Sequence, residues 1–142
     1  MGDINGVGPE VLSKALSLPE ASVRARLVIV GSTPVLDEVR RFLPKTPRIP
    51  IVASPEEARK HEISITDAGL EPPSYRPGAL DAAAGRCAVE WVKVAVRWAI
   101  DKRVAAIVTC PINKEGIHRA GYTYSGHTEL VAEMTGSSDY RM

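Results

Sequence analysis

Residues 27–34 read LVIVGSTP, and this stretch indicates the class of fold. Leu27–Val30 is a short, wholly apolar run that a glycine and a serine close. Such a run suits a strand that is buried on both faces, as in a parallel sheet. The segment VLDEVRRFL then follows Pro34 and reads as a helix that ends at Pro44. A buried strand followed at once by a helix is the repeating unit of α/β proteins.

The same alternation continues on both sides of this stretch. A glycine-rich turn, GDINGVGPE, precedes a helix that Pro9 is well suited to start. RIPIVAS and ISITDAG are predicted strands, with a short helical turn between them, and Pro50 suggests an edge position for the first. AAIVTCP predicts a second interior strand over Ala105–Thr109. We therefore expect one α/β region over residues 1–142, with a layered α/β/α arrangement.

A helix over Ala88–Ile100 is predicted to be covered over most of its circumference. Its polar residues recur at spacings of three and four and form one narrow stripe, which we expect to face outward: Glu90, Lys93 and Arg97. Trp91 and Trp98 on the same helix are expected to pack against protein. The proline- and glycine-rich segment 69–80 is interpreted as an ordered excursion rather than a linker, because apolar residues continue on both sides of it.

Composition excludes several classes of protein. The chain is 44% hydrophobic and 25% charged with a formal net charge of +1, so nothing favours nucleic acid or an acidic membrane as a partner. The two cysteines, Cys87 and Cys110, form no CxxC pattern. No apolar run is long enough to cross a bilayer, and the opening residues do not resemble a secretory signal. A cytoplasmic location is expected.

Three strand-to-helix turns carry the candidate chemistry, because ligands of open α/β sheets bind at such turns. GDINGVGPE lacks the GxGxxG spacing of dinucleotide loops and also fits a plain tight turn. In TCPINKEG, Asn113 can cap a helix, and Lys114 can reach a phosphate or carboxylate or simply be solvated. In YSGHTELVAEMTG, Ser125 is the expected cap and Gly136 the expected end of a helix whose start favours anions. His127 there is either a ligand-binding group or an incidental surface histidine.

Together and in this order, the three turns resemble the 4-hydroxythreonine-4-phosphate dehydrogenase family of pyridoxal phosphate biosynthesis. GDINGVGPE resembles the family's GDxxGxGPE opening, and AAIVTCPINKEGIHRAG resembles its strand and turn. YTYSGHTELVAEMTG resembles its PGHTE segment, with Ser125 where the family usually has proline. The resemblance implies NAD(P)-dependent oxidation of 4-phosphohydroxy-L-threonine to a β-keto acid that decarboxylates. It also implies a divalent metal (Zn, Mg or Co), a homodimer, and a fold like those of isocitrate and isopropylmalate dehydrogenases.

Carried over position by position, the resemblance makes His127 and Thr128 substrate-binding residues. Four further residues lie in matching motifs without an individual role: Asp3, Asn5, Asn113 and Lys114. Family enzymes are more than twice as long as this chain, and their metal-binding histidines follow the GHTE helix. The resemblance therefore covers an N-terminal portion without its first strand, predicts no metal ligands within the chain, and places them downstream of residue 142. It implies that these residues alone are inactive as a dehydrogenase.

Two other interpretations stay open. The first is a paralogous dehydrogenase of a related phosphorylated four-carbon acid, such as a phosphothreonate. The second is a non-catalytic domain, a remnant that binds a phosphorylated ligand.

Overall fold

The computed structural model describes residues 1–18, 25–43, 45 and 47–139. Within these residues the elements follow in the order α1 (Gly8–Leu16), β1 (Leu27–Val30), α2 (Thr33–Arg40), α3 (Pro55–Ala58), β2 (Ile63–Thr66), α4 (Ala82–Ile100), α5 (Lys114–Arg119) and α6 (His127–Thr135). The strand and helix predictions at Leu27–Val30 and after Pro34 are confirmed, although α2 ends at Arg40. The predicted end at Pro44 lies outside the described residues.

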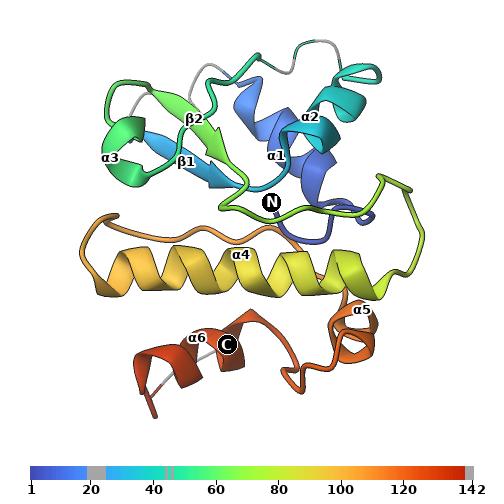
Figure 1. Ribbon diagram of the computed structural model, residues 1–142, viewed down its shortest axis with the longest axis vertical. Coiled ribbons are helices and arrows are strands. Elements are labelled where there is room, and N and C mark those ends of the chain that lie inside the picture. The colour runs from blue at the N-terminus through green and yellow to red at the C-terminus, as the bar shows by residue number, and fades with distance from the viewer. Residues whose placement is uncertain (19–24, 44, 46, 140–142) are drawn as a thin grey trace.

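The elements form layers, and the α/β class is confirmed (Figure 1). One apolar cluster joins Leu16 of α1 and Leu36 of α2 to Ile29 and Ile65 of the two strands. A second cluster joins Val30 and α2 to the tryptophans of α4, so α4 lies on the other side. Helices α5 and α6 pack against the far side of α4 (Figure 1). The candidate site forms where the chain passes between these layers.

The sheet that the described residues form has two parallel strands. β1 and β2 pair from Leu27 with Ile63 to Val30 with Thr66. RIPIVAS adds a single bridge, Ile51 with Ile65, rather than the predicted strand. Pro50 has no backbone N–H to donate, which limits how far this segment can pair.

The predicted interior strand Ala105–Thr109 is wrong. These residues form no strand, four of the five are exposed, and the side chain of Val108 is 95% exposed. Within the part of the chain that the structure describes, no backbone N–H of residues 105–110 donates a hydrogen bond. An apolar run becomes a strand only where a second backbone pairs with it, and the described residues offer none here.

Helix α4 is longer than predicted, because Asp81 caps it seven residues before Ala88. The Asp81 carboxylate accepts a hydrogen bond from the backbone N–H of Ala83 at 2.7 Å. Both tryptophans are buried as expected, with exposed fractions of 2% for Trp91 and 9% for Trp98. The polar stripe is only partly outward: Arg97 is exposed, whereas Glu90 and Lys93 are half-buried. Glu90 accepts hydrogen bonds from Lys93 and from the hydroxyl of Tyr122. The Lys93 ammonium group also lies over the Tyr122 ring, 4.7 Å from the ring centroid.

The excursion over residues 69–80 is ordered, as predicted. Its start is fixed by Trp91, whose indole N–H donates to the carbonyl oxygen of Asp67 at 3.0 Å. Its end is fixed by Asn5, which accepts from the backbone N–H of Arg76 through its side chain and from that of Gly78 through its carbonyl. The glycine-rich turn therefore holds a segment more than seventy positions away.

Among the described residues, no helix combines the length and the apolar character that a membrane span requires.

Candidate functional site

The first two candidate turns pack against each other. The backbone N–H of Asp3 donates to the carbonyl oxygen of Pro111 at 3.0 Å. Gly2 has a φ of +75°, and a Cβ atom there would lie 2.3 Å from the same oxygen. A side chain at this position would clash with backbone, so the glycine permits the close approach of the two turns.

The third turn reaches the same place through His127. The ring of His127 interacts with the backbone of Cys110, and the charge of the Met1 amino group is close enough to act on it. Its Nε2 atom is buried and has no hydrogen-bond partner among the described residues. Burial lowers the pKa of His127 from its usual 6.5, and the Cys110 backbone opposes this only in part. The neutral imidazole therefore presents an unused polar atom between the three turns.

Helix α6 begins without the cap that the sequence predicts. Its N-cap residue is Gly126, and no side chain bonds to the first turn. Ser125 instead donates from its backbone N–H at 2.7 Å, and from its hydroxyl, to the carboxylate of Glu129. This arrangement leaves the backbone N–H groups of His127 and Thr128 without a partner among the described residues, and Thr128 is half-buried beside them. Free N–H groups at a helix start favour an anion. Gly136 ends the helix as predicted, at a φ of 64°.

The two candidate residues of the second turn, Asn113 and Lys114, have different roles. Asn113 caps α5, since its side-chain oxygen accepts from the backbone N–H of Gly116 at 2.9 Å. Lys114 is exposed. The hydrogen bonds from Ser125 lower the pKa of Glu129 at the start of α6, and the charge of Lys114 lowers it further. Lys114 therefore lies close enough to α6 to contribute positive charge there, while Asn113 is structural.

Asp3 and Asn5 are buried polar residues of the glycine-rich turn. Burial raises the pKa of the Asp3 carboxyl, and the nearby charge of Asp81 raises it further, against the hydrogen bond from the backbone of Asn5. The side chain of Asn5 is used to hold Arg76, and its Nδ2 atom is buried without a partner among the described residues. These two residues hold the turn together and join it to residues 76–78.

The structure thus places His127 and Thr128 at the start of α6, where the charge of Lys114 acts on Glu129, and sets Asp3, Asn5 and Asn113 in supporting positions. The sequence interpretation missed the glycine pair that places α5. A Cβ atom on Gly85 of α4 would lie 2.3 Å from the backbone of Gly116, so the two helices touch through glycine.

It also missed Asp81, whose carboxylate caps α4 and pairs with Arg76 at 2.6 Å. An aspartate directly before a run of alanines was the available signal for that cap.

We next consider which of the described residues could hold a metal ion or a dinucleotide. These residues bring no three histidine, cysteine, aspartate or glutamate side chains together. The glycines of the first turn are used internally, because a Cβ on Gly8 would lie 2.4 Å from the carbonyl oxygen of Met1. Gly8 therefore serves the packing of the glycine-rich turn itself.

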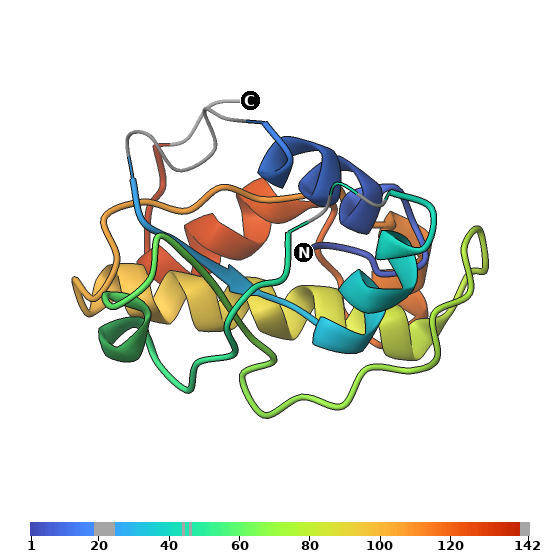
Figure 2. The ribbon, with the colours of Figure 1, turned by 90° about the horizontal axis from the view of Figure 1, so that it is seen from above.

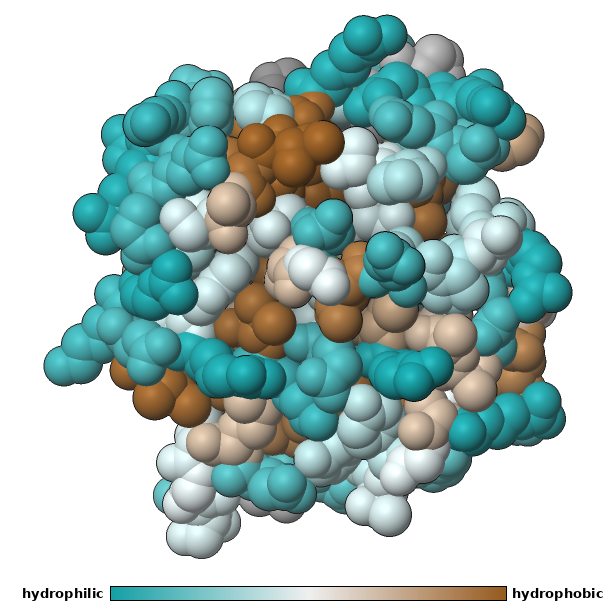
Figure 3. All heavy atoms as spheres, viewed as in Figure 1, coloured by the Kyte–Doolittle hydropathy of each residue, from teal (hydrophilic) through white to brown (hydrophobic). Residues whose placement is uncertain are grey.

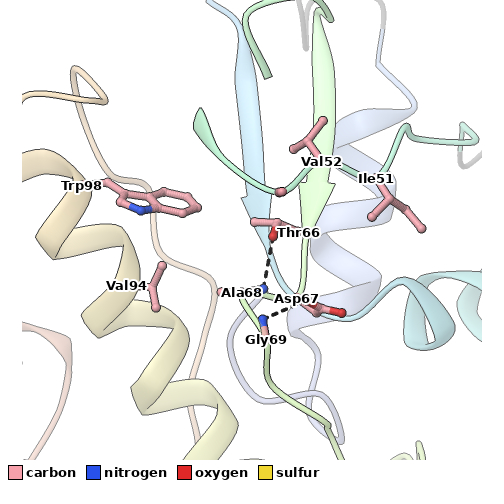
Figure 4. A pocket seen from close by; sticks show the side chains of 9 residues that line it. Ile51, Val52, Thr66, Asp67, Ala68, Gly69, Val94 and Trp98 are labelled. Carbon is pink, nitrogen blue, oxygen red and sulfur yellow. Dashed lines mark hydrogen bonds between the residues drawn. The ribbon is translucent and has the colours of Figure 1, made fainter. Parts of the chain in front are cut away.

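A separate cavity of about 530 Å³ lies at the carboxyl end of β2 (Figure 4). Trp98 and Val94 of α4 face Thr66 and the turn after it across this cavity. The polar groups of that turn bond within it: Ala68 N–H donates to Thr66 Oγ1 and Gly69 N–H to Asp67 Oδ1. Figure 3 shows hydrophobic patches between hydrophilic side chains on the face of the molecule that Figure 1 presents. None of the six predicted site residues lines the cavity.

Fold and site together define an α/β protein in which three turns meet around a half-buried histidine. The family model for the pyridoxal phosphate biosynthetic protein PdxA matches residues 23–142. The chain belongs to this family.

Several curated relatives match the whole chain, and two carry different names. It is 35% identical over 144 residues to D-threonate 4-phosphate dehydrogenase of Cupriavidus necator, covering 100% of this chain and 43% of that protein. It is 32% identical over 144 residues to 4-hydroxythreonine-4-phosphate dehydrogenase of Desulfosudis oleivorans, again covering 100% of this chain and 43% of that protein.

A solved structure agrees with the fold. The crystal structure of a 4-hydroxythreonine-4-phosphate dehydrogenase from Burkholderia phymatum matches with a TM-score of 0.87 at 34% identity, covering 98% of this chain and 43% of that one. The chain spans less than half the length of the relatives that it matches.

Proposed function

We propose that this chain supplies the substrate-binding region of a dehydrogenase that oxidises a phosphorylated four-carbon hydroxy acid. One observation carries the proposal: the buried, unpartnered Nε2 of His127 stands beside the uncapped start of α6. A buried polar atom without a partner costs free energy, which a ligand would recover by bonding to it. The names of the relatives support a phosphorylated substrate and a dehydrogenation.

In this proposal the phosphate or carboxylate of the substrate lies against the first turn of α6. The free backbone N–H groups of His127 and Thr128 donate to it, and the imidazole, which takes up a proton beside the anion, donates from Nε2. The hydroxyl of Thr128 is a further donor. Lys114 adds positive charge and offsets the carboxylate of Glu129, which also lies at this helix start.

Two substrates fit the proposal, and we place D-threonate 4-phosphate first. The relatives from Cupriavidus necator and Pectobacterium atrosepticum, 35% and 40% identical, are named for that compound. The family description and the relative from Desulfosudis oleivorans support 4-hydroxythreonine 4-phosphate, and with it pyridoxal phosphate biosynthesis. The two compounds differ at one carbon, which carries a hydroxyl in the first and an amino group in the second.

The cofactors and assembly are part of the same proposal. NAD or NADP would accept the hydride as the substrate alcohol becomes a ketone, and a divalent metal would stabilise the oxygen left by the departing proton. The family resemblance supports these cofactors and also a homodimer. A cytoplasmic location completes the proposal. The residues described above bind and orient the substrate in this scheme.

Ligand binding tests the proposal on the chain as it stands. We expect D-threonate 4-phosphate to shift the His127 ring signals in NMR spectra and to bind measurably by calorimetry. His127→Ala removes a hydrogen bond to a charged group, worth about 1.5–3 kcal/mol, and should weaken binding by roughly ten- to a hundred-fold.

His61→Ala is the matched control, because His61 precedes β2 at the opposite end of the strands. It should bind with unchanged affinity. Equal affinities for the His127→Ala variant and the unmodified chain would refute the role of the site. Tighter binding of 4-hydroxythreonine 4-phosphate would keep the site and exchange the substrate.

A further inference from the structure

Ser125 holds the carboxylate of Glu129 at the start of α6 by two hydrogen bonds. The backbone N–H of Ser125 donates to Oε2 of Glu129 at 2.7 Å, and the Ser125 hydroxyl donates to Oε1. Both carboxylate oxygens are therefore occupied by one residue that lies outside the helix. These bonds, the one from the hydroxyl first, lower the pKa of Glu129 and so keep its side chain charged.

Glu129 has other donors nearby, because it is the third residue of α6. A carboxylate in the first turn is attracted to the positive end of its own helix, where free N–H groups can donate to it. The N–H groups of His127 and Thr128 are free among the described residues, and the proposed function assigns them to the substrate anion. Glu129 is therefore a competitor of the substrate for the same donors, and Ser125 draws it away from them.

The segment before α6 is anchored, which makes Ser125 a fixed donor. Figures 1 and 2 show α5 and α6 on the same side of α4, joined by the segment that carries Ser125. The carbonyl oxygen of Tyr124 accepts from Nε2 of His118 in α5 at 3.0 Å, and the Tyr124 hydroxyl donates to Glu133 of α6 at 3.1 Å. The Tyr124 ring also stacks on that of Tyr122, with 6.1 Å between the centroids. The residue next to Ser125 is thus tied to both helices.

We propose that Ser125 is a positioning residue of the anion site: it holds the Glu129 carboxylate away from the start of α6 and so keeps the free N–H groups open for a phosphate or carboxylate. The inference rests on the proposed function of this site, and in it Ser125 acts through Glu129 rather than on the ligand. It explains why a helix start with an acidic side chain in its first turn has no side-chain cap. Lys114 acts in the same sense, because its positive charge also attracts Glu129.

Substitutions at Ser125 remove the two donors in steps, and binding of inorganic phosphate is the readout. Ser125→Ala removes the hydroxyl, and Ser125→Pro removes both the hydroxyl and the N–H. We expect the affinity, followed by the NMR signals of the His127 and Thr128 amides, to fall by about threefold in the first variant and roughly tenfold in the second. Ser125→Thr keeps both donors and is the matched control, so its affinity should be unchanged. Ser125→Ala keeps the backbone and carries the test if proline disturbs the fold.

Glu129→Ala separates positioning from a purely structural role of the same pair. If Ser125 acts by holding the carboxylate, Glu129→Ala should restore the affinity of the Ser125→Pro and Ser125→Ala chains and should not weaken binding by itself. If the pair only fixes the turn, Glu129→Ala alone should weaken binding as much as Ser125→Pro does. That result would overturn the proposal, and so would undiminished phosphate binding by both Ser125 variants.

A measurement without ligand distinguishes this inference from the proposed function. In the Ser125→Ala and Ser125→Pro chains, the amide signals of His127 and Thr128 should follow the titration of Glu129, whereas in the unmodified chain they should not. Because the ring of His127 titrates too, the dependence is assigned to Glu129 by its loss when Glu129→Ala is added. Amides that follow the Glu129 titration equally in the unmodified chain would overturn the inference. With the amide signals as expected, failure of the unmodified chain to bind phosphate would refute the proposed function, while the positioning of Glu129 by Ser125 stands.

Discussion

Gly85→Ala should destabilise the protein, although alanine is normally the better helix former. A Cβ atom on Gly85 would lie 2.3 Å from the carbonyl carbon and oxygen of Gly116 and 2.7 Å from the backbone nitrogen of Ile117. Ordinary contact begins at 3.4 Å, so α4 and α5 would have to separate by about 1 Å. The obstacle is backbone on both sides and cannot rotate away.

The expected magnitude is the difference between two opposing effects. Forcing an extra methyl group into packed structure costs about 1–3 kcal/mol. Replacing glycine by alanine within a helix returns about 0.5–1 kcal/mol. The net loss is therefore about 1–2 kcal/mol, or roughly 3–8 °C in Tm for a chain of this size. Separation of the helices would also shift the start of α5, and with it Lys114.

Gly116→Ala is the matched control, because it adds the same methyl group to the other member of the pair. Its Cβ would find its nearest neighbour at 3.6 Å, an ordinary contact. This variant should match the parent or gain up to about 1 kcal/mol. Urea unfolding followed by circular dichroism measures both changes. A Gly85→Ala variant as stable as Gly116→Ala would refute the close contact between the two helices.

Two further predictions concern the site and the turn beneath it. Because burial lowers the pKa of His127 below 6.5, the folded chain binds fewer protons at this residue than the unfolded chain does. The contribution of neutral His127 to stability should be complete above pH 6.5 and should fall as the pH drops through 6.5 toward the lowered pKa. NMR titration of His127 and unfolding measured at a series of pH values would check this. Asn5→Ala should lower the free energy of unfolding by about 1–3 kcal/mol and expose residues 69–80 to proteolysis, because the N–H of Arg76 loses its acceptor. The control Ser74→Ala, in the same segment, should change stability by less than about 0.5 kcal/mol.

Local signals in the sequence were sufficient where a structure depends on near neighbours. The cap by Asn113, the glycine end of α6 and the burial of Trp91 all follow from residues within one or two helical turns. Contacts between distant segments were not predictable in this way. Gly85 and Gly116 lie 31 positions apart, and nothing in either neighbourhood shows that they touch.

Two of the wrong predictions share a physical cause, which is that a local pattern leaves its partner undefined. Ser125 has the right chemistry to cap α6, but Glu129 competes for it and takes both its backbone N–H and its hydroxyl. Ala105–Thr109 has the apolar composition of a buried strand, but strand formation requires a second backbone.

The same reasoning explains why the local pattern leaves the role of His127 open, whereas the resemblance assigns it one. A histidine at a helix start is compatible with a solvated side chain, and the GHTE stretch alone contains nothing against it. The groups that act on the His127 ring include the Cys110 backbone and the Met1 amino group, which lie 17 and 126 positions away. The three turns contact one another around His127, so the three motifs together mark this position where a single motif does not. The site is therefore a property of the three turns together, and a change in any one of them should be felt at His127.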